Sequence, residues 1–187
     1  MSWHIPGLRL RPMLSALILA AGCGGRDANT ATGAWQFKVD TTRSETDGSV
    51  RESAWLRTSG TEHPQASPAS PGAKPAILSF DCFGNDALTT IITDQALRQG
   101  STETKLTVDA GKPRRIDGFA GTTPSGGQVV LTIPQDSMLA LLSGHRRARI
   151  EYADGAGSYK TIAEFPIKGL EKNRRPFLAT CAKIRTR

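Results

Sequence analysis

The sequence predicts a mainly β domain of the α+β class: a single antiparallel β-sandwich or curled sheet, with a short helix near residues 136–143 and a C-terminal helix. Three observations predict this class. Short stretches of alternating apolar and polar residues recur along the chain. Clusters of Gly, Pro, Asn and Asp separate them at close intervals. Apolar residues at helical spacing occur in only two short stretches, both in the last third of the chain.

The first 22 residues have the features of a bacterial secretory signal peptide. Arg9 and Arg11 provide a positive start, and residues 13–21 form an uncharged, mostly apolar stretch that is too short to span a bilayer. Residues 19–23, Leu-Ala-Ala-Gly-Cys, resemble the lipobox of bacterial lipoproteins. This resemblance implies that Cys23 carries lipid and becomes the first residue of the mature chain. The alternative is an ordinary signal peptide in which Cys23 is incidental.

The expected location is the bacterial cell envelope. Lipoproteins kept in the inner membrane often carry Asp after the lipidated Cys, so Gly24 favours an outer-membrane anchor facing the periplasm. Residues 23–33 have no apolar periodicity and are expected to form a flexible tether. Residues 34–187 are expected to form one β-rich globular domain.

The first half of this domain is expected to begin with strands at residues 35–39 and 50–58, where apolar and polar residues alternate. Residues 59–75 contain several Pro and no Leu, Ile, Val or Phe, and we expect a mobile Pro-rich loop there. A strand at 76–83 and its return at 87–93 form a predicted hairpin, because Gly-Asn-Asp separates them.

The second half is expected to contain further strands and both helices. Strands are predicted at residues 104–109, 115–120, 128–133, 147–153 and 158–165. The short helix fits between the third and fourth of these. The C-terminal helix is expected to carry Pro176 in its first turn, with Phe177, Cys181 and Ile184 on one face.

The cysteine count predicts one disulfide. If Cys23 carries lipid, Cys82 and Cys181 remain, and an oxidising compartment favours their pairing. Both lie on predicted apolar faces. Metal binding is disfavoured because there is no Cys-x-x-Cys motif and only His63 and His145 follow the leader, so we expect no metal site and no cofactor.

Charge is uneven along the chain. Residues 144–187 hold eleven Lys or Arg and four Asp or Glu, whereas residues 23–143 are slightly acidic. The predicted patch for an anion or partner consists of Arg146, Arg147, Arg149, Arg174 and Arg175. The alternative is an ordinary solvated face. Nucleic acid is excluded as a partner by the expected compartment and by the lack of a recognition motif, which leaves an envelope protein or another anionic envelope component.

No catalytic motif is present, so we expect a non-catalytic binding or accessory module held on the membrane by its lipid. The alternative is a lipid-anchored hydrolase acting on envelope glycan, peptide or lipid. Asp81 and Asp86 flank a turn and are explained first by turn chemistry. Trp35 and Trp55 are expected in the core rather than on a sugar-binding platform.

The order of several elements resembles the TagO (VasI) proteins, periplasmic or lipid-anchored accessories of type VI secretion. The features that carry it are Trp35, the strand 75–82 ending in Cys82, the apolar run Met138–Leu142, the strand Arg149–Tyr152, the segment Glu164–Leu170 and Cys181. The resemblance spans residues 34–184 and implies an accessory role beside a secretion system.

Overall fold

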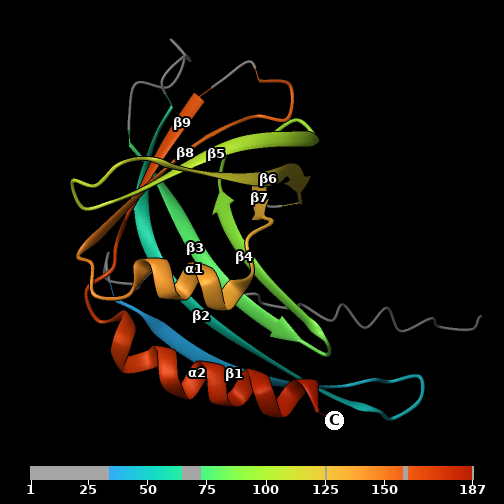
Figure 1. Ribbon diagram of the computed structural model, residues 1–187. Helices are drawn as coiled ribbons and strands as arrows, with labels where there is room; N and C mark the ends of the chain where they lie inside the picture. Colours follow the sequence, from blue (N-terminus) through green and yellow to red (C-terminus); the bar gives the residue numbers. More distant parts are fainter. Residues whose placement is uncertain (1–33, 65–72, 125, 158–159, 187) are drawn as a thin grey trace, which may run out of the picture.

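A computed structural model describes residues 34–64, 73–124, 126–157 and 160–186. The predicted signal peptide, the tether and Cys23 lie outside these residues. The described chain forms nine antiparallel strands and two helices (Figure 1). Within these ranges no helix has the length and hydrophobicity needed to span a membrane.

The elements follow one another with short connections. The strands are β1 (Gln36–Arg43), β2 (Val50–Pro64), β3 (Lys74–Phe83), β4 (Asp86–Thr93), β5 (Gly100–Val108), β6 (Arg114–Thr123), β7 (Gly126–Leu131), β8 (Arg147–Ala153) and β9 (Lys160–Pro166). The helices are α1 (Gln135–Leu142) and α2 (Leu170–Arg185).

Eight of the strands close into a β-barrel, so the prediction of a β-sandwich or curled sheet is wrong. The strands lie in the order β2-β3-β4-β7-β6-β5-β8-β9, and β9 pairs again with β2. β1 is an additional strand on the edge of β2. The apolar alternation of the strands is the same in a sandwich and in a barrel; only the β2–β9 pairing distinguishes them.

β2 closes the barrel because it is long enough to change partners. Its residues 50–57 pair with β1 and its residues 61–64 pair with β9 along one edge, while β3 occupies the other edge. Gly60 lies at the changeover, where a Cβ atom would be 2.1 Å from the carbonyl oxygen of Glu164. The expected loop at 59–75 is therefore wrong at both ends, because residues 59–64 belong to β2 and Lys74 and Pro75 belong to β3. Residues 65–72 lie outside the described ranges.

The core fills the barrel interior and the space between the barrel and the helices. Alternate residues of β3 are fully buried, as expected from their pattern, and include Leu78 and Phe80. Trp35 is also buried, as predicted, and its ring lies 6.0 Å from that of Phe80. Both helices lie toward the lower end of the barrel in Figure 1. They cover the inner side chains there with Met138, Leu139, Leu142 and Phe177.

A disulfide between Cys82 on β3 and Cys181 on α2 confirms the predicted pairing. α2 begins at Leu170 rather than near Pro176, so the proline lies inside the helix. An interior proline costs a helix about 3 kcal/mol, partly through a lost backbone hydrogen bond. Burial of Leu170 and Phe177 on the two sides of Pro176, together with the disulfide, offsets this cost.

Candidate functional site

The start of β8 is fixed by an aspartate that follows β5. Asp109 adopts a left-handed backbone conformation with φ of 48°. Its carboxylate Oδ1 accepts hydrogen bonds from the backbone N–H groups of Arg146 and Arg147, each at 3.0 Å, and its Oδ2 lies 2.9 Å from His145 Nδ1. The hydrogen bond to His145, followed by those from the two backbone amides, lowers the pKa of Asp109. Asp109 thus contacts three consecutive residues, His145, Arg146 and Arg147, and fixes the chain at the start of β8.

Arg146 and Arg147 line a groove at the seam where the barrel closes. The groove has a volume of about 380 Å³ and lies where β2 exchanges β1 for β9. Its other lining residues are Gly60, Thr61, Glu164, Phe165 and Pro166. Neither guanidinium forms an ion pair within the described part of the chain, and both arginines are exposed. The groove is therefore a concave surface lined by two arginines without an ion-pair partner among the described residues and by one acid, Glu164.

The other three predicted patch residues have different environments. Arg149 is exposed on β8 and does not line the groove. It pairs in register with Glu164 of β9, which does line it. Arg174 lies inward: its Nη1 donates to Ser143 Oγ at 3.1 Å and lies 3.6 Å from the Glu171 carboxylate. It connects α2 to the end of α1, so its charge does not belong to an open patch.

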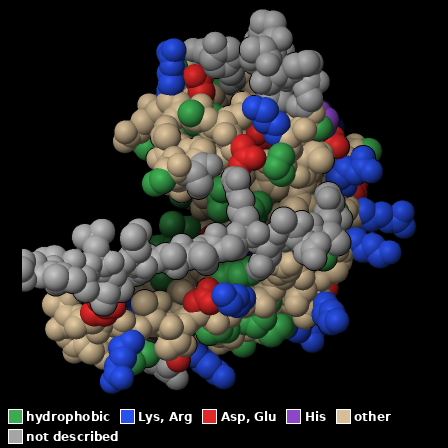
Figure 2. All heavy atoms as spheres, turned by 180° about the vertical axis from the view of Figure 1, so that it is seen from behind, with side chains coloured by type: hydrophobic (Ala, Val, Ile, Leu, Met, Phe, Trp, Pro, Cys, Tyr) green, Lys and Arg blue, Asp and Glu red, His purple; other side chains and the backbone are tan. Residues whose placement is uncertain are grey.

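Arg175 is exposed on α2 and does not line the groove. In the view of Figure 2, which shows the molecule from behind, Lys and Arg side chains gather along the right-hand side. The predicted five-residue patch thus reduces to a pair, Arg146 and Arg147, with Arg149 beside it.

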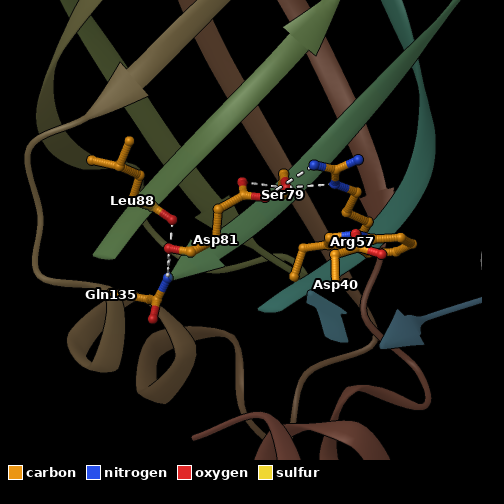
Figure 3. Close-up of polar contacts among 7 residues, drawn as sticks. Asp40, Arg57, Ser79, Asp81, Leu88 and Gln135 are labelled. Carbon is orange, nitrogen blue, oxygen red and sulfur yellow. Dashed lines mark hydrogen bonds and ion pairs between the residues drawn. The ribbon is translucent and has the colours of Figure 1, made fainter. Parts of the chain in front are cut away.

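A second polar arrangement crosses the outer face of β1, β2 and β3 (Figure 3). The guanidinium of Arg57 donates to Ser79 Oγ at 2.9 Å and to Asp81 Oδ1 at 3.0 Å, and it stacks on Trp55 at 4.6 Å. Trp55 Nε1 donates to Asp40 Oδ2 at 2.9 Å. Trp55 is therefore half-buried on the outer face, and the prediction that it is a core residue is wrong.

This outer-face network gives Asp81 a structural role. Its carboxylate accepts hydrogen bonds from the Arg57 guanidinium and from the Ser79 hydroxyl. Gln135 at the start of α1 donates to the backbone oxygens of Asp81 and Leu88, each at 3.0 Å (Figure 3). These bonds fasten α1 to the β3–β4 hairpin.

A buried acid lies inside the barrel, where the sequence predicted a loop. Glu62 has no exposed surface, and its carboxyl accepts hydrogen bonds from Thr93 Oγ1 at 2.6 Å, Gln95 Nε2 at 2.8 Å and Tyr152 OH at 2.8 Å. Burial, and then the charge of the nearby Glu62 carboxyl, raise the pKa of Tyr152 far above its usual value of 10. Three donors satisfy this acid internally, which is typical of a structural rather than a ligand-binding group.

A second hollow of about 320 Å³ lies in the wall between β5 and β8. The ladder between these strands ends at Lys105 and Glu151, and beyond it the hydroxyl of Thr102 bridges the gap to both backbone groups of Ala153. Lys160 and Glu103 also line the hollow, so its charge is mixed. Across the described ranges, His, Cys, Asp and Glu side chains form no group of three that could hold a metal ion.

Comparison with known proteins adds a distant structural neighbour. No family model and no curated protein matches the chain. Among solved structures, it is similar to the invasion associated protein B of Bartonella henselae, with 11% sequence identity and a TM-score of 0.48. The alignment covers 80% of this chain and 95% of that one.

Proposed function

We propose that this protein is a lipid-anchored, non-catalytic binding module of the bacterial envelope that holds an anionic partner in the groove of Arg146 and Arg147. The observation that carries the proposal is the geometry of that pair. Asp109 fixes the backbone of both arginines, and neither guanidinium is neutralised by a described acid.

Arginine pairs of this kind suit carboxylate and phosphate groups. A guanidinium presents a planar fork of donors that can bind two oxygens at once. Some arginines of the chain have acidic partners, such as Arg57 with Asp81 and Arg115 with Glu103, whereas other exposed arginines, such as Arg51 and Arg98, do not line the groove. Arg146 and Arg147 keep their donors available beside a concave surface, which favours binding over a purely structural role.

The envelope location rests on the leader and on the oxidised cysteines. A disulfide between Cys82 and Cys181 fits an oxidising compartment, and residues 1–22 followed by Cys23 fit a lipoprotein signal. Cys23→Ser should release the protein from membranes, and intact mass should show the missing lipid. A role beside a type VI secretion system rests on the TagO-like order of elements alone.

The binding proposal is tested by charge reversal. The native domain and an Arg146→Glu/Arg147→Glu variant serve as bait for solubilised envelopes, at low and at physiological salt. We expect the variant to lose the partner, and the native protein to capture less of it as salt rises, because screening weakens exposed charge attraction. Arg51→Glu/Arg98→Glu is the matched control, since it makes the same change of charge at exposed arginines that do not line the groove. Equal capture by all three proteins at both salts would contradict the proposal.

A further inference from the structure

The barrel has one strand edge that closure does not remove. β1 lies outside the closed circle and pairs with β2 alone among the described strands. Ser44 N donates to Ser49 O at 2.8 Å, in register with the β1–β2 ladder. Because antiparallel pairing alternates with a period of two, even-numbered residues of β1 bond to β2. The N–H and C=O groups of Phe37, Val39 and Thr41 therefore point to the other edge.

Among the described residues, the start of this edge is covered and the rest is open. The backbone oxygen of Trp35, which has the same parity, accepts from Asn173 Nδ2 of α2 at 3.4 Å. α2 then passes toward Cys82 on β3, away from β1. Val39 is consequently 44% exposed, one of few large apolar side chains with such exposure among the described residues. An exposed edge of this kind is a template for another strand.

The charges on β1 are self-complementary about Val39. Lys38 and Asp40 point to the outer face, and their side chains are 2.7 Å apart. If a second β1 pairs antiparallel with Val39 opposite Val39, Lys38 of each copy lies opposite Asp40 of the other. These are the non-hydrogen-bonded positions, where side chains on adjacent strands are closest. Four charges of alternating sign then meet on one face, and two valines meet on the other.

We propose that two copies of this protein associate through an antiparallel β1–β1 ladder centred on Val39. The edge lysine would hinder the addition of an unrelated strand, whereas a second copy supplies the matching aspartate. The shared ladder is short compared with stable interfaces, which bury about 1,200–2,000 Å². The dimer should therefore be weak, with a dissociation constant between micromolar and millimolar.

Sedimentation equilibrium of the full chain carrying Cys23→Ser, across that concentration range, tests the proposal. Lys38→Asp replaces two attractive contacts by two repulsive ones and should weaken association about tenfold or more. The swapped variant Lys38→Asp/Asp40→Lys restores the complementarity and should return association to near the native value. A swapped variant that associates as poorly as the single variant would overturn the register.

A backbone variant tests the ladder independently of charge. Val39→Pro removes an N–H that points to the open edge and no hydrogen bond to β2, so it should abolish association and leave the circular dichroism spectrum unchanged. Val50→Pro is the matched control, because Val50 is also exposed and its N–H does not face β1. A native protein that is monomeric throughout, or a Val39→Pro protein that still dimerises, would overturn the proposal.

Discussion

Replacing Glu62 by Leu should destabilise the barrel strongly, although the two side chains are similar in size. The Glu62 carboxyl accepts hydrogen bonds from Thr93, Gln95 and Tyr152 in the interior. Leucine accepts none. Thr93 is 2% exposed and Tyr152 is 1% exposed, so water cannot reach their hydroxyls to replace the lost acceptor. The amide of Gln95 is only half-buried and can reach water.

The magnitude follows from the two hydroxyl donors, on Thr93 and Tyr152, that lose their acceptor. Each buried polar group without a partner costs about 1–3 kcal/mol, so Glu62→Leu should cost about 2–6 kcal/mol. This is a large part of the total of about 5–15 kcal/mol that is typical of a domain. Removing the Tyr152 donor as well, in Glu62→Leu/Tyr152→Phe, should recover part of the loss because that hydroxyl is no longer left without an acceptor. Thr93 is kept, because its Oγ1 also accepts a hydrogen bond from the backbone N–H of Gln95 at 3.0 Å.

Urea unfolding followed by far-ultraviolet circular dichroism measures these differences. Glu103→Leu is the control, since Glu103 is 46% exposed and its ion pairs contribute little. The reasoning fails if Glu62→Leu unfolds at the same urea concentration as the native protein. It also fails if Glu62→Leu/Tyr152→Phe is less stable than Glu62→Leu.

Three further predictions concern the disulfide, the barrel seam and the basic segment. The Cys82–Cys181 bond joins residues 99 positions apart, and the chain-entropy model gives about 4–5 kcal/mol as its upper contribution, so reduction should lower the melting temperature; an unchanged melting curve would contradict this. Gly60→Ala should speed amide hydrogen exchange in β9, because its Cβ would lie 2.1 Å from the Glu164 carbonyl oxygen; native exchange rates would refute the tight seam. The lowered pKa of Asp109 means that its contribution to stability is present above the ordinary value of 3.8 and is lost as pH falls through the lower folded value. Asp109→Asn should therefore lose less stability in acid than the native protein, and identical acid unfolding curves would count against the contact.

The cysteine count and the expected compartment predicted the disulfide, and local periodicity supported it. Alternation in β3 directs Cys82 inward beside Leu78 and Phe80, and helical spacing places Cys181 on the same face as Phe177. Both signals depend only on near neighbours in the sequence. They survive in a barrel as they would in a sandwich, so the pairing was right although the predicted architecture was wrong.

Barrel closure was not visible in the sequence because the closing part of β2 has no apolar alternation. Its inward positions hold Thr58, Gly60 and Glu62, and for Gly60 and Glu62 the reason lies elsewhere in the chain. Gly60 admits β9, and Glu62 needs donors from β4 and β8 and from the segment after β4. Composition alone therefore indicated a loop.

The candidate site was predicted in part. The charge runs identified Arg146 and Arg147, but they could not show that Arg174 is occupied by Ser143 and Glu171. Nor did they identify Asp109, whose partners lie 36 to 38 residues further along the chain. An aspartate just after a strand is a weak sign of a left-handed turn. The neighbouring residues in the sequence do not indicate which groups its carboxylate contacts.

Site-specific photo-crosslinking in the living bacterium tests the central claim most directly. A photoreactive residue at Thr61 would lie in the groove beside Arg146 and Arg147, whereas one at Ser101 would lie in the other hollow, between β5 and β8. The account predicts an adduct with a partner at Thr61, none at Ser101, and loss of the Thr61 adduct in Arg146→Glu/Arg147→Glu. An absent Thr61 adduct, or one that survives the charge reversal, would contradict the groove as the binding site.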